Sequence, residues 1–293
     1  MSENYILSCE STVDLPFDYV TGRNIPVLFY TYTVDGNEYE DHMVRTKEKY
    51  DQFYKFIEDG FFPRTSQINE YRYVEYLEPL IQKGDVIHVV LGTGMTKSYM
   101  SALSAAEQLK EKYTGRKIAV IDSTCSCTGY GLLVDIAADM RDAGAGFDEV
   151  VSWLENNKHK IGHQFFSTDM KYFRRSGRVS GVAATVASVL GICPLMRLDY
   201  NGKIVAYQKV RGVKNTIKKT VDEVVAHIEK EPNHKMYISN SNCNELAKEV
   251  REEIEKALPQ YKNKITECQI GSIIASHCGP GTVAVFFVGD DRP

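Results

Sequence analysis

Short, mostly apolar runs alternate with longer amphipathic runs through the first 160 residues. Short apolar runs bounded by polar turns are typical of buried strands, and apolar positions spaced three and four apart are typical of helices. Because parallel strands need crossover connections, this alternation predicts an α/β fold with a mostly parallel sheet and helices on its faces. We expect strands at 5–9, 26–34, 86–91 and 117–121, and helices at 47–58, 71–82, 98–113, 132–143 and 147–158.

The second half of the chain has a different pattern. Residues 193–198 and 204–208 flank the dipeptide Asn201-Gly202, which favours a turn between two antiparallel strands. This change of pattern predicts two α/β domains, at residues 1–160 and 161–293. We expect further strands at 161–167, 235–239, 265–269 and 283–288, and helices at 182–191, 214–230 and 245–258.

Hydroxyl side chains mark several of the turns that follow the predicted strands. In open α/β sheets ligands bind beyond the carboxyl ends of the strands, so these turns are expected to converge on one crevice. The segment 92–102 (GTGMTKSYMSA) joins a strand to a helix and offers free backbone N–H groups to an anion. The hydroxyls are Ser11 and Thr12, Thr93 and Thr96, Ser123, Thr124 and Ser126, with Thr65 and Ser66 at an expected helix start.

The kind of anion is constrained by the spacing of that segment. A Walker A loop places its second glycine directly before the lysine, whereas here Thr96 precedes Lys97. A carboxylate or phosphate held by hydroxyls and N–H groups fits better than a nucleotide triphosphate. The alternative is that Thr96 only caps the helix. Arg178 and His277 have structural alternatives too, as a solvated basic loop and as a hydrogen-bonded core histidine.

Composition narrows the class of protein. The hydrophobic share is 43% and the net charge is −4, which argues against a broad nucleic-acid footprint. No apolar run approaches the roughly 18 residues of a membrane span, and the N-terminus lacks the regions of a signal peptide, so we expect a cytoplasmic protein. The seven cysteines are scattered and form no zinc knuckle, which predicts reduced thiols and no metal site.

Motifs for catalysis are missing from the sequence. There is no G-x-S-x-G, no H-E-x-x-H and no obvious carboxylate dyad, and a catalytic site needs a base near a nucleophile. A binding protein is therefore the first prediction. The alternative is an enzyme that acts on a small phosphorylated or carboxylated metabolite, with His277 or Asp122 as its base.

Seven segments read together resemble one family in order. ESTVDLP (10–16) is similar to DSxxDLP, RTSQI (64–68) to TSQP, and GTGMTKSYMSA to SSxLSGTYQSA. VIDSTCSCTGYG (120–131) is similar to VIDSxxxSxGxG, and MKYFRRSGRVS (170–180) to LxxLKRSGRIS. LGICPLMRLDYNGKI (190–204) is similar to LLxIKPILxxxxGxI, and SHCGPGTVAV (276–285) to THxGPGAxGV. The chain thus resembles, from end to end, the DegV family of bacterial fatty-acid-binding proteins.

The resemblance implies a fold, a ligand and a partner. It implies two α/β domains with a long-chain fatty acid such as palmitate, stearate or oleate in an apolar tunnel between them. It also implies no cofactor and no catalysis by this chain, which would present the carboxylate to a separate fatty acid kinase subunit for phospholipid synthesis. The residues that the resemblance assigns to the carboxylate are Thr65, Ser66, Thr96, Ser98, Arg178 and His277, with Arg211 as a candidate for docking the partner.

Departures from the family pattern fall inside these motifs. The first aspartate is Glu10, and the proline after TSQ is Ile68. Thr96 replaces a serine and keeps its hydroxyl, which is compatible with carboxylate binding. Lys97 replaces a glycine, which adds bulk and charge beside the expected site.

Overall fold

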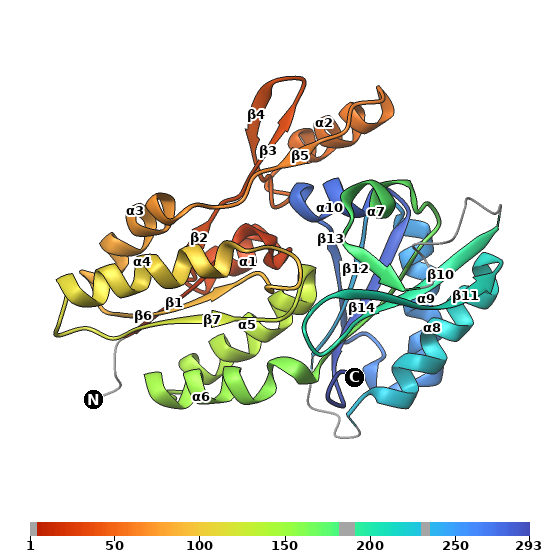
Figure 1. Ribbon diagram of the computed structural model, residues 1–293. Coiled ribbons are helices and arrows are strands. Elements are labelled where there is room, and N and C mark those ends of the chain that lie inside the picture. The colour runs from red at the N-terminus through yellow and green to blue at the C-terminus, as the bar shows by residue number, and fades with distance from the viewer. Residues whose placement is uncertain (1–4, 182–190, 230–234) are drawn as a thin grey trace.

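The computed structural model describes residues 5–181, 191–229 and 235–293 (Figure 1). Its N-terminal part holds a four-stranded sheet in which every pair of neighbours is parallel, as the alternating pattern predicts. The two central strands are almost fully buried, and their near-continuous apolar sequence suits a strand covered on both faces. In sheet order the strands are β2 (Val27–Leu28), β1 (Tyr5–Glu10), β6 (Asp85–Val90) and β7 (Ile118–Asp122).

Helices pack on both faces of this sheet. Two of them lie side by side on one face and two others on the opposite face (Figure 1). The helices at 70–81, 98–112 and 147–157 begin close to where the helical spacing predicts. The helix at 17–22 was not expected, and the helix at 127–142 begins five residues before its expected start at 132. The helices are α1 (Phe17–Gly22), α3 (Glu70–Ile81), α4 (Ser98–Lys112), α5 (Cys127–Asp142) and α6 (Phe147–Asn157).

The C-terminal part is built on a seven-stranded mixed sheet. One core cluster joins this sheet to two helices on its outer face, and α5 packs against its inner face, so α5 lies between the two sheets. In sheet order the strands are β13 (Ile265–Gln269), β12 (Met236–Asn240), β14 (Thr282–Val288), β8 (Ile161–Ser167), β10 (Ile192–Leu198), β11 (Ile204–Arg211) and β9 (Val179–Gly181). The outer helices are α8 (Val213–His227) and α9 (Asn244–Ala257), and two short helices are α7 (Lys171–Ser176) and α10 (Ser272–Cys278).

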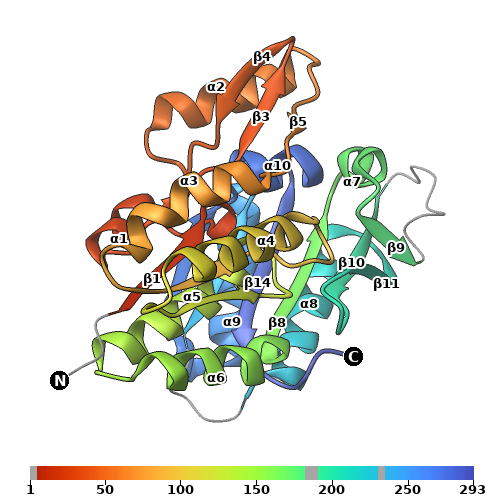
Figure 2. The same cartoon turned by 60° about the vertical axis from the view of Figure 1, so that its left-hand side comes forward.

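A small antiparallel sheet and one helix stand out from the rest of the molecule (Figure 2). Aromatic side chains hold this unit together: the ring of Tyr32 packs on Tyr39 and edge-on to Phe53 at centroid distances of 5.5 Å. The single strand predicted at 26–34 is therefore wrong, because its first part joins the parallel sheet and its second part joins this unit. The unit contains β4 (Asn37–Glu40), β3 (Thr31–Val34), β5 (Arg64–Thr65) and α2 (Lys47–Glu58).

Other expectations are also corrected. The helix start expected at Thr65 and Ser66 is wrong, because Thr65 pairs with Tyr32 as part of β5. The helix begins at Glu70, where the Asn69 side chain accepts a hydrogen bond from the Arg72 amide at 3.0 Å. Helix α10 was not expected. The helix predicted at 182–191 lies outside the described residues, except for its last residue.

The loop between β10 and β11 of the seven-stranded sheet contacts the loop that follows β6 of the four-stranded sheet. Strands β10 and β11 form the antiparallel hairpin that the sequence predicts, with a loop of five residues, 199–203, rather than a two-residue turn. Gly202 in this loop lies against Gly94, with no room for a side chain at either position. The four-stranded sheet uses strands before residue 123 and the seven-stranded sheet uses strands from residue 161. The division into domains at 160 stays a prediction.

Candidate ligand-binding site

A cavity of about 440 Å³ lies between the two sheets, a size common for small-molecule sites. One group of lining side chains is apolar and comes from both parts of the chain. It includes Leu91, Met95, Phe165, Phe173, Leu198, Ile204, Ile270, Ile273, Ile274, Ala284 and Phe286. A second group is polar and includes Thr65, Ser66, Gln67, Thr96, Lys97, Arg178 and His277.

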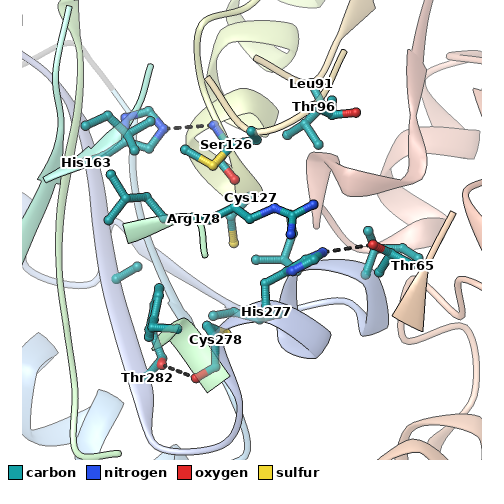
Figure 3. Close-up of a pocket in the computed structure, with 18 of the residues that line it drawn as sticks. Thr65, Leu91, Thr96, Ser126, Cys127, His163, Arg178, His277, Cys278 and Thr282 are labelled. Atoms are coloured by element: carbon teal, nitrogen blue, oxygen red, sulfur yellow. Dashed lines mark hydrogen bonds between the residues drawn. The ribbon is translucent and has the colours of Figure 1, made fainter. Parts of the chain in front are cut away.

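The side chains of Thr65 and His277 meet at the polar part of the cavity (Figure 3). Thr65 lies on β5 and His277 in the last turn of α10, and Thr65 Oγ1 is 2.9 Å from His277 Nε2. Burial, followed by the nearby Arg178, lowers the pKa of His277 to about 4, so the imidazole is neutral near pH 7. When Nε2 carries the proton and donates it to Thr65, the threonine hydroxyl keeps its own hydrogen for a ligand.

The loop between β6 and α4 brings a second hydroxyl to the cavity. Thr96 Oγ1 lies 3.0 Å from Ser98 Oγ and accepts a longer bond from the Ser98 amide at 3.3 Å. Ser98 is fully buried behind Thr96 and does not line the cavity. The N-cap position of α4 is Lys97, so Thr96 is not simply the cap of this helix.

Two cationic side chains line the same cavity. Arg178 follows α7 and donates a hydrogen bond to the Ser176 carbonyl, and its guanidinium points toward His277 (Figure 3). Lys97 precedes α4, and both cations are exposed. None of the described residues that line the cavity is acidic, so its polar part is positively charged. Such a site suits an anionic headgroup.

The remaining residues that the sequence singles out lie elsewhere. Arg211 is exposed at the end of β11 and does not line the cavity. Asp122 also lies outside the cavity and accepts hydrogen bonds from Thr93 and Thr124. As a base for the alternative enzyme in this cavity, Asp122 is therefore misplaced.

Sequence reasoning missed two lining residues with polar contacts, His163 and Tyr30. His163 accepts a hydrogen bond from the Ser126 amide at Nε2 (3.2 Å), and its Nδ1 lies 2.9 Å from the Ile161 carbonyl, a pairing that makes Nδ1 the protonated nitrogen (Figure 3). Burial lowers the pKa of His163 to about 3, so this ring acts as a neutral structural link. Tyr30 is the second, and no local signal in the apolar run 26–34 separates it from core tyrosines.

A buried carboxyl group lies directly behind the cavity wall. Glu10 is fully buried and accepts hydrogen bonds from the Leu91 amide at 2.8 Å and from the hydroxyls of Tyr30, at 3.2 Å, and Tyr73. Burial raises the pKa of Glu10 to about 7, although these three hydrogen bonds oppose the rise. Leu91 and Tyr30 both line the cavity and both contact Glu10, so a single layer of residues separates Glu10 from the cavity.

The described part of the chain contains neither a cluster of metal-ligating side chains nor a helix that could span a membrane. Within 5–181, 191–229 and 235–293, no three His, Cys, Asp or Glu side chains gather as they would around a metal ion. None of the helices in these same ranges is long and apolar enough to cross a membrane.

The fold and the cavity together define a class of protein: an α/β protein with an amphipathic cavity between its two larger sheets. Comparison with known proteins then gives the family. A family model described as an uncharacterised protein of the DegV family matches residues 7–290. The chain belongs to the DegV family.

Relatives with the same domain cover the whole chain. A DegV domain-containing protein of Clostridium perfringens (strain 13 / Type A) is 33% identical over 291 residues, with 99% of both chains covered. A DegV domain-containing protein of Streptococcus pyogenes serotype M3 is 28% identical over 290 residues, which cover 98% of this chain and 99% of that one.

Solved structures share the fold at lower sequence identity. A fatty-acid-binding DegV family protein of Thermus thermophilus has a TM-score of 0.85 at 21% identity, covering 98% of this chain and 99% of that one. The Streptococcus pneumoniae fatty acid kinase B3 protein, loaded with linoleic acid, has a TM-score of 0.83 at 20% identity, covering 98% and 100%. The two-sheet α/β architecture is thus the fold of proteins that bind fatty acids.

Proposed function

We propose that this chain binds a long-chain fatty acid between its two sheets, with the carboxylate at the polar part of the cavity. One observation carries the proposal: an apolar cavity wall adjoins a group of hydroxyls and cations that includes no acidic side chain among the described residues. Such a site matches a ligand with a long apolar tail and a single anionic head. Thr65, Ser66, Thr96, Arg178 and His277 line the polar part, and Ser98 supports Thr96 from behind.

The acyl chain and the carboxylate of such a ligand would contribute differently to the free energy of binding. Each buried CH₂ group contributes about 0.8 kcal/mol, so an acyl chain of palmitate length contributes about 10 kcal/mol before costs. Loss of translational and rotational freedom offsets about 4–15 kcal/mol of this. Hydrogen bonds to a charged carboxylate add about 1.5–3 kcal/mol each before desolvation. The apolar wall would therefore set affinity and chain preference, and the hydroxyls would set orientation.

We further propose that the bound carboxylate is presented to a separate kinase subunit in the cytoplasm, and that this chain performs no chemistry itself. The similarity to a fatty acid kinase B3 protein supports a kinase partner. The exposed cations Lys97 and Arg178 mark the end at which a partner would reach the headgroup. Arg211, exposed and outside the cavity, is a candidate contact for that partner.

Extraction of bound lipid tests the proposal. The purified chain is extracted with organic solvent, and the extract is analysed by mass spectrometry. We expect a saturated or monounsaturated long-chain fatty acid in the wild type, and much less in the double variant Thr65→Val, Thr96→Val, which keeps side-chain shape and removes both hydroxyls. Thr114→Val, at an exposed turn away from the cavity, is the matched control.

Three outcomes decide between the parts of the proposal. Wild-type protein with no co-purifying and no exchangeable fatty acid would refute the ligand. Equal retention in the double variant and the control would remove both threonines from the headgroup site. For Arg211, pull-down of a purified fatty acid kinase subunit by loaded protein should weaken in Arg211→Ala, and unchanged capture would exclude that contact.

A further inference from the structure

The hydroxyl group of Ser126 lies at the cavity without a hydrogen-bond partner. Three hydroxyl side chains follow β7 in the turn that leads to α5. Those of Ser123 and Thr124 are bonded within the turn, at 3.3 Å to the Cys125 carbonyl and at 2.7 Å to the Ser123 carbonyl. Ser126 is half-buried and lines the cavity, and its Oγ has no partner among the described residues. This hydroxyl is therefore available to a ligand.

Hydrogen bonds on both sides of Ser126 fix its backbone. Its amide donates to His163 Nε2 at 3.2 Å, and its carbonyl accepts from the Tyr130 amide at 3.3 Å. Ser126 is the N-cap residue of α5, a position from which a serine side chain usually bonds an amide of the first helical turn. The backbone is extended, as at other N-caps, but the side chain makes no such bond. The hydroxyl is thus not used to cap the helix.

The cavity wall next to Ser126 is otherwise apolar or already paired. Both ring nitrogens of His163 are bonded to backbone groups, and the ring packs edge-on to Phe286 at a centroid distance of 5.2 Å. In the view of Figure 3 the guanidinium of Arg178 lies between Ser126 and Thr65. Under the proposed function, Ser126 would therefore contact the acyl chain rather than the carboxylate.

An unsubstituted acyl chain would leave the Ser126 hydroxyl unpaired. The chain would displace water from this part of the wall, and a buried hydroxyl without a partner opposes binding. A hydroxyl group on the acyl chain would remove that cost, because each of the two hydroxyls is able to donate and to accept. A site that bonds a hydroxyl of its ligand disfavours the analogue that lacks it.

We propose that Ser126 is a specificity-determining residue and that the preferred ligands are hydroxy fatty acids, which carry a hydroxyl group along a long acyl chain. The inference rests on the proposed function and narrows its ligand. The carboxylate binds at Thr65 and Thr96, and the hydroxyl of the chain bonds Ser126 further along the cavity. Unsubstituted fatty acids bind in the same cavity more weakly.

Competition binding measures this preference. Delipidated protein is loaded with a fluorescent fatty acid, which is then displaced by octadecanoate or by a series of octadecanoates hydroxylated at successive even-numbered carbons from 2 to 12. We expect at least one isomer to bind about tenfold more tightly than octadecanoate, the gain from one satisfied hydrogen bond. Isomers whose hydroxyl meets the apolar wall should bind no more tightly than octadecanoate.

Two variants test the role of Ser126. Ser126→Ala removes the hydroxyl, so the preferred isomer should lose its advantage, while octadecanoate should bind at least as tightly as to wild type. Ser126→Cys keeps the shape of the side chain with a much weaker hydrogen-bonding group, so it should also lose the preference, and it carries the test if Ser126→Ala fails to fold. Ser152→Ala, at an exposed position on α6 outside the cavity, is the matched control and should behave as wild type.

The results distinguish this inference from the proposed function. Wild type that binds octadecanoate as tightly as every hydroxylated isomer overturns the ligand class and leaves fatty-acid binding intact. A preference that persists in Ser126→Ala assigns the hydroxyl of the chain to another group and also overturns the inference. An equal loss of affinity for all ligands in Ser126→Ala would place Ser126 at the carboxylate and overturn it as well. Wild type that binds none of these ligands refutes both proposals.

Discussion

A methyl group added at Gly94 is expected to separate the two walls of the cavity. Gly94 lies in the loop that carries Thr96, and the hairpin loop with Gly202 packs directly on it. The strands on either side of that hairpin contribute Leu198 and Ile204 to the cavity. A displacement at this contact therefore acts on both the hydroxyl loop and the apolar wall.

The size of the effect follows from the contact distances. A Cβ atom at Gly94 would lie 2.2 Å from the Gly202 carbonyl oxygen and 2.7 Å from the Lys203 amide nitrogen, whereas ordinary contacts begin at 3.4 Å. Both neighbours are backbone atoms, so no side chain can rotate away. Overpacking of this kind costs about 1–3 kcal/mol. The melting temperature of a domain of this size falls roughly 2–4 °C for each kcal/mol.

The assay compares Gly94→Ala with Gly115→Ala. A Cβ at Gly115 meets no atom within 4 Å, so this control should melt within about 0.5 kcal/mol of wild type. We expect Gly94→Ala to melt several degrees lower and to retain less fatty acid after purification. A Gly94→Ala protein with the melting temperature and lipid content of the control would show that the hairpin contact does not hold the cavity together.

Three further predictions concern the rest of the molecule. Asp135→Ala should lower stability by about 3 kcal/mol in urea unfolding, because the buried carboxylate bonds Arg23 at 2.8 Å and Lys235 at 2.6 Å, and an unchanged midpoint would contradict this. The pKa of His277 is about 4 in the folded state and 6.5 in the unfolded state. The free energy of unfolding should therefore fall by up to about 3 kcal/mol as pH falls from 6.5 to 4. The difference between wild type and His277→Asn isolates this loss from Glu10, whose raised pKa acts in the opposite direction, and a constant difference would refute it. Native protein should react with a thiol reagent at no more than one of its seven cysteines, since all are free and six are buried, and fast labelling of several would contradict the described core.

The sequence predicts most of the parallel sheet because its strands are buried on both faces. Such strands are short apolar runs, so β1, β6 and β7 are found within one residue of their limits. The start of α5 is missed because residues 127–131 contain two glycines, which disfavour helix. One of them, Gly129, is needed because a Cβ there would lie 2.2 Å from His163 Nε2. That contact joins residues 34 positions apart and leaves no local signal.

Helix α10, which carries His277, was also missed because its start depends on a contact that is distant along the chain. Its two consecutive isoleucines favour strand, and it has only seven residues. Its start is fixed by Asp41, which accepts hydrogen bonds from the Ser272 amide at 3.1 Å and the Ser272 hydroxyl at 2.7 Å, across more than 200 positions. The local pattern of apolar residues gives no sign of these hydrogen bonds, so the helix that positions His277 could not be predicted from it.

The candidate site is predicted better by motif resemblance than by local pattern. The motifs single out Thr65, Thr96, Arg178 and His277, and all four line one cavity. Their assignment to a carboxylate stays a prediction. Glu10 stands out in the sequence only as a departure from a motif, because its buried hydrogen bonds with Tyr30 and Tyr73 join residues that are distant along the chain.

Lys97 is compatible with headgroup binding for a physical reason. The lysine is exposed, so its bulk lies at the cavity rim rather than inside, and its charge has the same sign as that of Arg178. Exposed charges act at a distance and are screened by salt, whereas short hydrogen bonds from half-buried hydroxyls such as those of Thr65 and Thr96 are much less affected. Under the proposed function, the two cations would attract the carboxylate to the rim, and the neutral groups Thr65, Thr96 and His277 would fix its orientation. Raising ionic strength should then slow fatty-acid association more than it speeds dissociation, and Lys97→Gly should reduce that dependence without loss of retention.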